Sequence, residues 1–164
     1  MVATAPTLSP AGDRGFIHAQ NRVGAGPEPM EAVMSARDIL STCLHIRDGG
    51  GTDAIAVSES FWEELAAGRY PQLDQGRLMS AFAFFEPWST WERHPAGEEL
   101  VMLLSGAATV LLEASGHEHA VLLGEPGAYR LVPRNVWHTA RTSVPTTMLF
   151  LTPGAGTEHR PVGA

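Results

Sequence analysis

From residue 77 onward, short apolar runs alternate with turn-forming residues. Proline or glycine occurs in every break between these runs. Many short strands at such spacing are typical of antiparallel sandwiches and barrels. No helical segment alternates with the strands, so a parallel α/β sheet is disfavoured. The apolar runs span residues 78–85, 89–94, 100–104, 108–113, 120–123, 128–132, 136–140 and 147–151.

The segment before residue 77 predicts two further strands and one short helix. Residues 40–46 and 54–57 have the composition of strands. Ser60 and Glu63 have the spacing of a capping box at the start of a helix. Gly68 is placed to end that helix. We expect this one helix to pack on the outside of the β-structure.

The two ends of the chain lack the pattern of the middle. Residues 1–35 are rich in alanine, glycine and proline and show no apolar period. Such a segment buries too little apolar surface to order itself, so we expect a disordered tail. The organised domain is expected over residues 36–155, with its motif-bearing core at 77–155. Residues 156–164 are expected to form a C-terminal tail.

The composition agrees with one globular domain. The chain has 164 residues, of which 44% are hydrophobic and 18% are charged, and this length suits a single core. Acidic residues outnumber basic ones by 18 to 11, for a formal charge of -7. No run of lysine or arginine offers an electrostatic footprint for phosphates or anionic lipid. We therefore expect neither nucleic acid nor a membrane as a partner.

The single cysteine and the lack of targeting signals indicate a cytoplasmic location. Cys43 has no second cysteine with which to form an internal disulfide, which suits a reducing compartment. On its predicted strand it is expected to be a small buried hydrophobe rather than a reactive thiol. No apolar segment is long enough to span a bilayer. The N-terminus lacks the basic start and apolar core of a secretion signal.

Candidate metal ligands gather around a turn at residues 95–97. Side chains alternate between faces along a strand, so Glu92 and His94 point the same way. After the turn, Glu98 or Glu99 opens the next strand. We expect two adjacent antiparallel strands to present these groups to one spot. A carboxylate, an imidazole and a second carboxylate make a workable ligand set for a divalent metal.

A second stretch, residues 127–138, runs from a glycine through a proline turn to a histidine. Gly127 bounds a strand that leads into the turn at Pro133. The next strand begins almost at once, with His138 near its start. This stretch supplies a second imidazole close to a strand end.

Together the two stretches resemble the two motifs of the cupin family. The first family motif is His-x-His, three or four residues, Glu, six residues, Gly. At these spacings the chain has Glu92-x-His94, then Glu99, then Gly106. The amino-acid sequence around this motif is similar to that of small single-domain bacterial cupins of the cupin-2 type.

The second family motif is Gly, five residues, Pro-x-Gly, two residues, His, three residues, Asn. The chain has Gly127, Pro133, Asn135, His138 and Thr142 at these positions. Asparagine in place of the second glycine is a mild change, because it tolerates a positive φ. The departure that bears on chemistry is the glutamate that replaces the first motif histidine.

The resemblance implies an all-β fold, an antiparallel jelly-roll β-barrel, with a metal ion held inside by Glu92, His94, Glu99 and His138. Two imidazoles with two carboxylates are a harder ligand set than three imidazoles with one carboxylate. Fe, Mn or Zn is therefore the expected divalent metal, and Cu is less suited. Glu99 has the motif spacing and is favoured over Glu98, although a one-residue slip of the strand would exchange their faces.

The cupin family includes dioxygenases, isomerases, decarboxylases, cyclases and non-catalytic binding proteins, so the fold does not fix the function. The resemblance implies a metal-dependent enzyme of the oxygenase or isomerase class, such as a dioxygenase. Its ligand would be a small oxygen-bearing organic molecule. The alternative is a non-catalytic small-molecule or metal-sensing module. Cupins are often dimers, so a homodimer is expected.

Other interpretations of the histidines remain beside the metal site. In a cupin pocket that has lost its metal, Glu92 and His94 would form an acid–base or hydrogen-bonding pair. The literal motif His117-Glu118-His119 follows a Ser-Gly hairpin turn and lacks a glutamate at the required distance. We interpret it as an exposed loop pair. His159 lies in the glycine-rich C-terminal segment, where no pattern supports a role at the barrel mouth.

Overall fold

The computed structural model describes residues 35–163, so the tail predicted for residues 1–35 lies outside the described residues apart from Ser35. The described part is built almost entirely from strands. In chain order the elements are β1 (Thr42–Ile46), β2 (Thr52–Ala56), α2 (Phe61–Ala66), the 3-10 helix η1 (Pro71–Asp74), β3 (Arg77–Phe84), β4 (Thr90–Arg93), β5 (Glu99–Ser105), β6 (Ala108–Ala114), β7 (His117–Leu123), β8 (Tyr129–Val132), β9 (Trp137–Thr142), β10 (Thr146–Pro153) and β11 (Glu158–Pro161).

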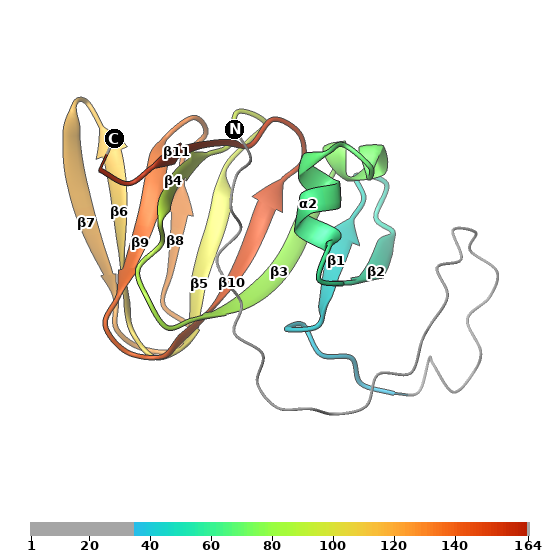
Figure 1. Ribbon diagram of the computed structural model, residues 1–164, viewed down its shortest axis with the longest axis horizontal. Helices are drawn as coiled ribbons and strands as arrows, with labels where there is room; N and C mark the ends of the chain where they lie inside the picture. The colour runs from blue at the N-terminus through green and yellow to red at the C-terminus, as the bar shows by residue number, and fades with distance from the viewer. Residues whose placement is uncertain (1–34, 164) are drawn as a thin grey trace.

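The strands form two sheets that face each other, as Figure 1 shows. One sheet has the order β2-β1-β3-β10-β5-β8, and the other has the order β11-β4-β9-β6-β7. Every strand pair in the two sheets is antiparallel. This arrangement confirms the predicted antiparallel all-β barrel. None of the helices within residues 35–163 has the length and apolar content that crossing a bilayer requires.

The main core fills the space between the two sheets. Along β5 the side chains alternate between buried and half-buried, so Val101 and Leu103 both face inward. β6 contributes Val110 and Leu112 from the opposite sheet. Because a strand has a side-chain period of two, each strand can give one face to this core and the other to solvent. The buried members of the core are Phe84, Val101, Leu103, Ala108, Val110, Leu112, Leu123, Val132, Met148 and Phe150.

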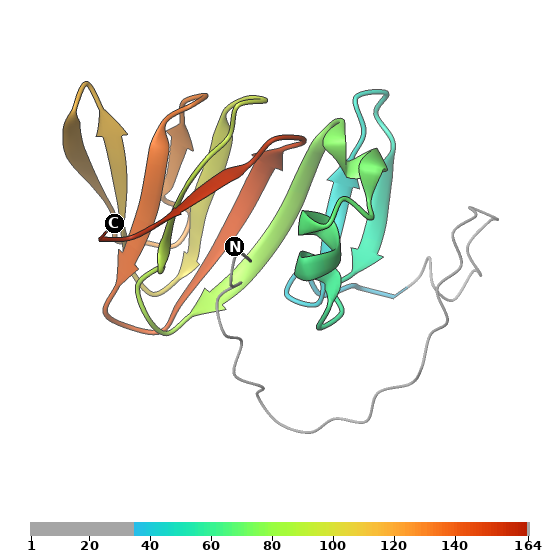
Figure 2. The same ribbon diagram turned by 45° about the horizontal axis from the view of Figure 1, so that its top comes forward.

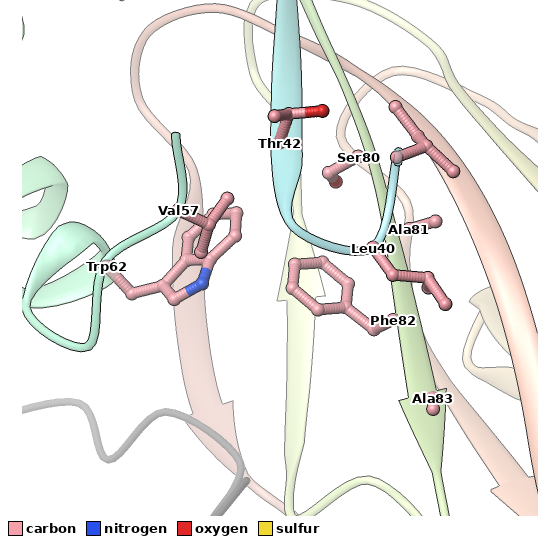
Figure 3. A pocket seen from close by; sticks show the side chains of 9 residues that line it. Leu40, Thr42, Val57, Trp62, Ser80, Ala81, Phe82 and Ala83 are labelled. Carbon is pink, nitrogen blue, oxygen red and sulfur yellow. The ribbon is translucent and has the colours of Figure 1, made fainter. Parts of the chain in front are cut away.

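The N-terminal elements form a second, smaller cluster at the edge of the six-stranded sheet. Hairpin β1–β2 extends this sheet, and α2 lies beside it (Figure 1). Cys43, Phe61 and Leu73 are the buried members of the cluster. A hollow of about 140 Å³ is lined by Trp62 of α2 and by Phe82 of β3, among other residues (Figure 3).

Helix α2 begins differently from the expectation. It has six residues, and the Ser60 side chain makes no capping hydrogen bond to the backbone. Ser60 Oγ instead donates to Glu64 Oε1 at 3.1 Å. The predicted capping box is therefore wrong. A helix this short depends on burying Phe61, because an isolated single turn is unstable in water.

Two segments predicted to be irregular are strands. His117-Glu118-His119 is the exposed start of β7, not a loop, and it pairs with β6. The two-residue turn Ser115-Gly116 before it has φ values of 54° and 77°, which match the twist of a tight hairpin. The C-terminal segment 156–164 contains β11, which pairs with β4 (Figure 2).

The register of β5 gives a direct test of the main core. Leu103 is 0% exposed and Leu104 is 37% exposed. Leu103→Ala should lower the free energy of unfolding by about 2–5 kcal/mol, because it leaves a cavity in a packed core. Leu104→Ala should change it by about 0.5 kcal/mol or less. Urea unfolding measures both, and equal losses would contradict this register.

The smaller cluster gives a second test through its thiol. Cys43 is 0% exposed, and burial raises its pKa to about 12. At pH 8 the native thiol should therefore react with iodoacetamide about a thousandfold more slowly than in the unfolded chain, whose cysteine has a pKa of about 8.5. Mass spectrometry of timed samples with and without guanidinium measures the ratio. Comparable rates would show that Cys43 is accessible.

Candidate metal centre

The four predicted ligands come from three strands in two different sheets. Glu92 on β4 and His138 on β9 are register partners in the five-stranded sheet. His94 directly follows β4, and Glu99 is the first residue of β5 in the six-stranded sheet. The expectation that one pair of adjacent antiparallel strands presents these groups is therefore wrong. The turn at residues 95–97 instead carries the chain from one sheet to the other.

The structure brings the four side chains to one spot between the sheets. One ligand atom of each lies within 4.8 Å of all the others. Glu99 Oε2 is 2.8 Å from His138 Nε2 and 3.2 Å from His94 Nε2. Glu92 Oε1 is 3.6 Å from His138 Nε2. Ligand atoms about 2.0–2.2 Å from a tetrahedral ion stand about 3.4 Å apart, so small shifts would let these atoms surround one ion.

Three of these ligand atoms are buried and have no hydrogen-bond partner among the described residues: His94 Nε2, Glu99 Oε2 and His138 Nε2. They are close enough for ion pairing but are not oriented as hydrogen bonds to one another. Buried polar atoms are nearly always hydrogen-bonded. Donor atoms that converge without bonding to each other fit a cation at their centre. The group can therefore hold a divalent metal ion.

The far sides of two of these ligands are held by neighbouring groups. Thr152 Oγ1 donates to Glu99 Oε1 at 2.6 Å. His138 Nδ1 lies 3.4 Å from the carbonyl oxygen of Val136. Contacts of this kind orient metal ligands by fixing the atom that does not face the ion. They leave Glu99 Oε2 and His138 Nε2 directed toward the centre.

The negative charge of Glu99 and the positive charge of a protonated His138 stabilise each other. Burial raises the pKa of the Glu99 carboxyl, but His138 and His94 outweigh burial and lower it well below its usual range. Burial lowers the pKa of His138, but Glu99 and then Glu92 outweigh it, and the net pKa is raised. Each group thus favours the charged form of the other. Without a metal, Glu99 is a carboxylate and His138 holds a proton over a wider pH range than a free imidazole.

The structure distinguishes the two neighbouring glutamates. Glu99 is 2% exposed and shares the inward face of β5 with Val101 and Leu103. Glu98 is exposed, and its carbonyl oxygen accepts a hydrogen bond from Arg77 Nη1 at 3.0 Å. The group of four therefore contains Glu99 and not Glu98.

The turn of the second motif is tied to the first motif. Asn135 has a φ of 63°, a backbone conformation that asparagine tolerates. Its backbone N–H donates to the carbonyl oxygen of His94 at 3.2 Å. This bond fixes the start of β9 relative to the end of β4. His94 and His138 are thereby held with their ring centroids 5.5 Å apart.

The sequence reasoning missed two residues beside the site, both in the C-terminal segment. Thr157 Oγ1 is 3.0 Å from His94 Nδ1. His159 on β11 is the register partner of Glu92, and its Nε2 lies 3.5 Å from Glu92 Oε2. Residues 157–160 are all polar, so they lack the alternation of apolar and polar residues that predicts a half-buried strand. No local signal therefore pointed to Thr157 or His159.

The literal His-x-His sequence does not join the group. His119 is the register partner of Leu112, and Leu112 is in turn the partner of His138. His119 therefore lies two strands away from His138 in the same sheet. His117 and His119 are both exposed.

Solvent reaches the centre from the side of Glu92. The Glu92 side chain is 21% exposed, whereas those of His94, Glu99 and His138 are at most 3% exposed. A hollow of about 350 Å³ lies between residues 74–77 and 153–154 and contains none of the four. The hollow beside Trp62 contains none of them either. Any ligand of the centre would therefore approach along Glu92.

Comparisons with known proteins found similar solved structures, each aligned over about half of this chain. A scan against protein-family models and a search of curated proteins found no match. Similar solved structures include a cupin-2 domain protein from Shewanella frigidimarina, with 13% identity over 47% of this chain and 70% of that chain and a TM-score of 0.41. Hydroquinone 1,2-dioxygenase from Sphingomonas sp. TTNP3 matches with 19% identity over 48% of this chain and 60% of that chain, at a TM-score of 0.40.

A third similar structure is that of the DMSP lyases RdDddP and RnDddQII. It matches with 26% identity over 54% of this chain and 45% of that chain, at a TM-score of 0.43. The chain thus spans less than two thirds of the dioxygenase and of the lyase.

The raised pKa of His138 predicts how metal affinity depends on pH. A metal ion needs the deprotonated imidazole, so binding must displace the proton of His138. Below the raised pKa, the affinity for Zn²⁺ should increase about tenfold per pH unit, because about one proton is released per ion. Calorimetry in buffers of different ionisation enthalpy counts that proton. An affinity that stays constant between pH 5.5 and 7 would contradict the protonated state of His138.

Proposed function

We propose that this chain, which has the fold of the cupin superfamily, binds one divalent metal ion through Glu92, His94, Glu99 and His138. The observation that supports this proposal is the convergence of three buried donor atoms without hydrogen-bond partners. Packing four polar side chains at the end of an apolar core is costly unless a bound group compensates them.

The donor set favours particular metals. Two neutral imidazoles and two carboxylates balance a divalent ion, so the occupied site carries no net charge. Mixed nitrogen and oxygen ligands suit Fe(II) and Mn(II), and Zn(II) is compatible. Softer sites with more sulfur or nitrogen would be needed to favour copper.

We further propose that the site acts on a small oxygen-bearing organic molecule, in a reaction of the oxygenase or isomerase class. The bound ion would supply Lewis acidity, or redox capacity for a reaction with dioxygen. A bound molecule would reach the ion from the side of Glu92, which is the half-buried ligand. His159 lies beside Glu92, and its side chain is 41% exposed. Glu92 Oε2, which faces His159, is the carboxylate atom placed to accept a proton from a bound molecule.

The second candidate function is a non-catalytic small-molecule or metal-binding module. The low solvent exposure of the centre favours this function, because three of the four side chains are at most 3% exposed. A ligand would then bind at the Glu92 side and leave unchanged. A thermal-shift screen with and without oxygen separates the two functions. A molecule that stabilises the protein and is recovered intact supports binding, and one that is converted supports catalysis.

The metal site is tested by purification without chelator and metal analysis by mass spectrometry. The wild type should carry close to one ion of Fe, Mn or Zn per chain. Glu99→Gln should lose most of it, because a neutral amide leaves the imidazoles without their central carboxylate. Glu98→Gln is the matched control and should keep the full metal content, because Glu98 is exposed.

Two results would contradict the proposed site. One is a wild-type protein that takes up no stoichiometric metal even after incubation with each of the three ions. The other is full metal content in the double variant His94→Ala with His138→Ala, which would place the ion elsewhere on the chain.

A further inference from the structure

We propose that the C-terminal segment formed by residues 157–161 is a strap that positions the metal ligands from outside, with Thr157 as its positioning residue. The inference rests on the proposed metal site and extends it to residues that lie outside the two cupin-like motifs. Figure 2 shows β11 crossing one end of the barrel beside β4.

The inward side of the strap contacts two of the four ligands. Thr157 immediately precedes β11, and its Oγ1 lies 3.0 Å from His94 Nδ1. Two residues further on, His159 Nε2 lies 3.5 Å from Glu92 Oε2. Residues two apart on a strand share a face, so one face of the strap carries both contacts.

The outward side of the strap is fastened to the surface of the barrel. Glu158 Oε2 accepts two hydrogen bonds from Arg93, from Nε at 3.1 Å and from Nη2 at 2.7 Å. Arg160 pairs with Glu113. Its guanidinium also stacks over the rings of Trp91 and Trp137, 5.2 and 4.6 Å from their centroids. Such stacked and paired contacts hold a planar arginine in one orientation.

The path into the strap is fixed by a close backbone contact. A Cβ atom on Gly154 would lie 2.3 Å from the carbonyl oxygen of Asp74, so only glycine fits there. The N–H groups of Gly154 and Ala155 donate to the carbonyl oxygens of Gly76 and Asp74. The chain therefore leaves β10 along one defined route and reaches His94 at Thr157.

The Thr157 contact has a chemical consequence for His94. A neutral imidazole carries its proton on one nitrogen and offers a lone pair on the other. His94 Nε2 faces the other three ligands, so metal binding requires that Nδ1 carries the proton. Thr157 Oγ1 is the acceptor for that proton. The strap thereby selects the tautomer and the ring orientation that metal binding needs.

The experiment compares Thr157→Val with Thr157→Ser in the full chain. Valine keeps the shape of threonine but removes the hydroxyl acceptor, and serine keeps the acceptor. The metal-free proteins are titrated with Zn²⁺ and with Mn²⁺ alone, against a chelating dye. Thr157→Val should bind about 10–100-fold more weakly than the wild type, the usual effect of losing a hydrogen-bond partner of a ligand. Thr157→Ser should lose less than about tenfold.

Two controls separate positioning from general damage. Thr109→Val makes the same change on β6, where the register partners are Leu122 and Arg141, and should bind both metals like the wild type. Hydrogen exchange measured by mass spectrometry should show β11 still protected in Thr157→Val, because Glu158 and Arg160 keep their outward contacts. β11 could instead lose its protection in Thr157→Val while Thr157→Ser keeps both protection and affinity. That result would also support the role of the Thr157 hydroxyl in positioning His94.

The outcomes distinguish this inference from the proposed function. Wild-type protein that binds neither metal would overturn both. Wild-type binding with equal affinity in Thr157→Val would overturn the strap alone. Equal losses in the valine and serine variants would also overturn it, because they would show that the hydroxyl is not what His94 needs.

Discussion

The Glu99 carboxylate lies between the two sheets with 2% of its side chain exposed, and it constrains everything around it. Taking such a charge out of water costs several kcal/mol unless partners compensate it. Glu99 cannot turn outward, because it shares the inward face of β5 with Val101 and Leu103. The positive charge that compensates it comes from the facing sheet, where His138 lies 2.8 Å away, while Thr152 on the neighbouring strand β10 hydrogen-bonds its other oxygen. The centre is thus also a junction between the sheets.

The buried ionisable residues of the barrel interior, His94, Glu99 and His138, lie together at one spot between the sheets. In the five-stranded sheet, register partners run in a row from His159 through Glu92, His138 and Leu112 to His119. Val110 and its register partner Ala140 are buried and apolar. The ionisable groups thus lie at the end of an apolar core. This position leaves the centre within reach of solvent at Glu92.

The sequence predicted the parts of this protein that depend on local pattern. Short apolar runs separated by turn residues located the strands, and motif spacing selected Glu92, His94, Glu99 and His138. The same reasoning failed where the structure depends on pairing between strands that are distant in the sequence. Nothing local shows that the turn at 95–97 changes sheets, because strand pairing is set by the register of distant segments.

The C-terminal segment shows the same limit. Its four polar residues have too few apolar neighbours to predict a strand. They adopt the strand conformation through pairing with β4. The exposed start of β7 was misjudged for a related reason. A polar edge strand resembles a loop until its hairpin partner is known.

The arrangement of the donor atoms bears on whether the pocket would function without a metal. A hydrogen-bonded acid–base pair between Glu92 and His94 would place one proton between two aligned atoms. Aligned bonds do occur in this site, as between Thr152 Oγ1 and Glu99 Oε1 at 2.6 Å. The inner atoms differ, because three of them converge without such alignment. The outer atoms thus have hydrogen-bond partners while the inner ones point at a common centre. A proton has one donor and one acceptor, but a metal ion accepts several lone pairs at once. This geometry therefore favours a cation over a shared proton at the centre.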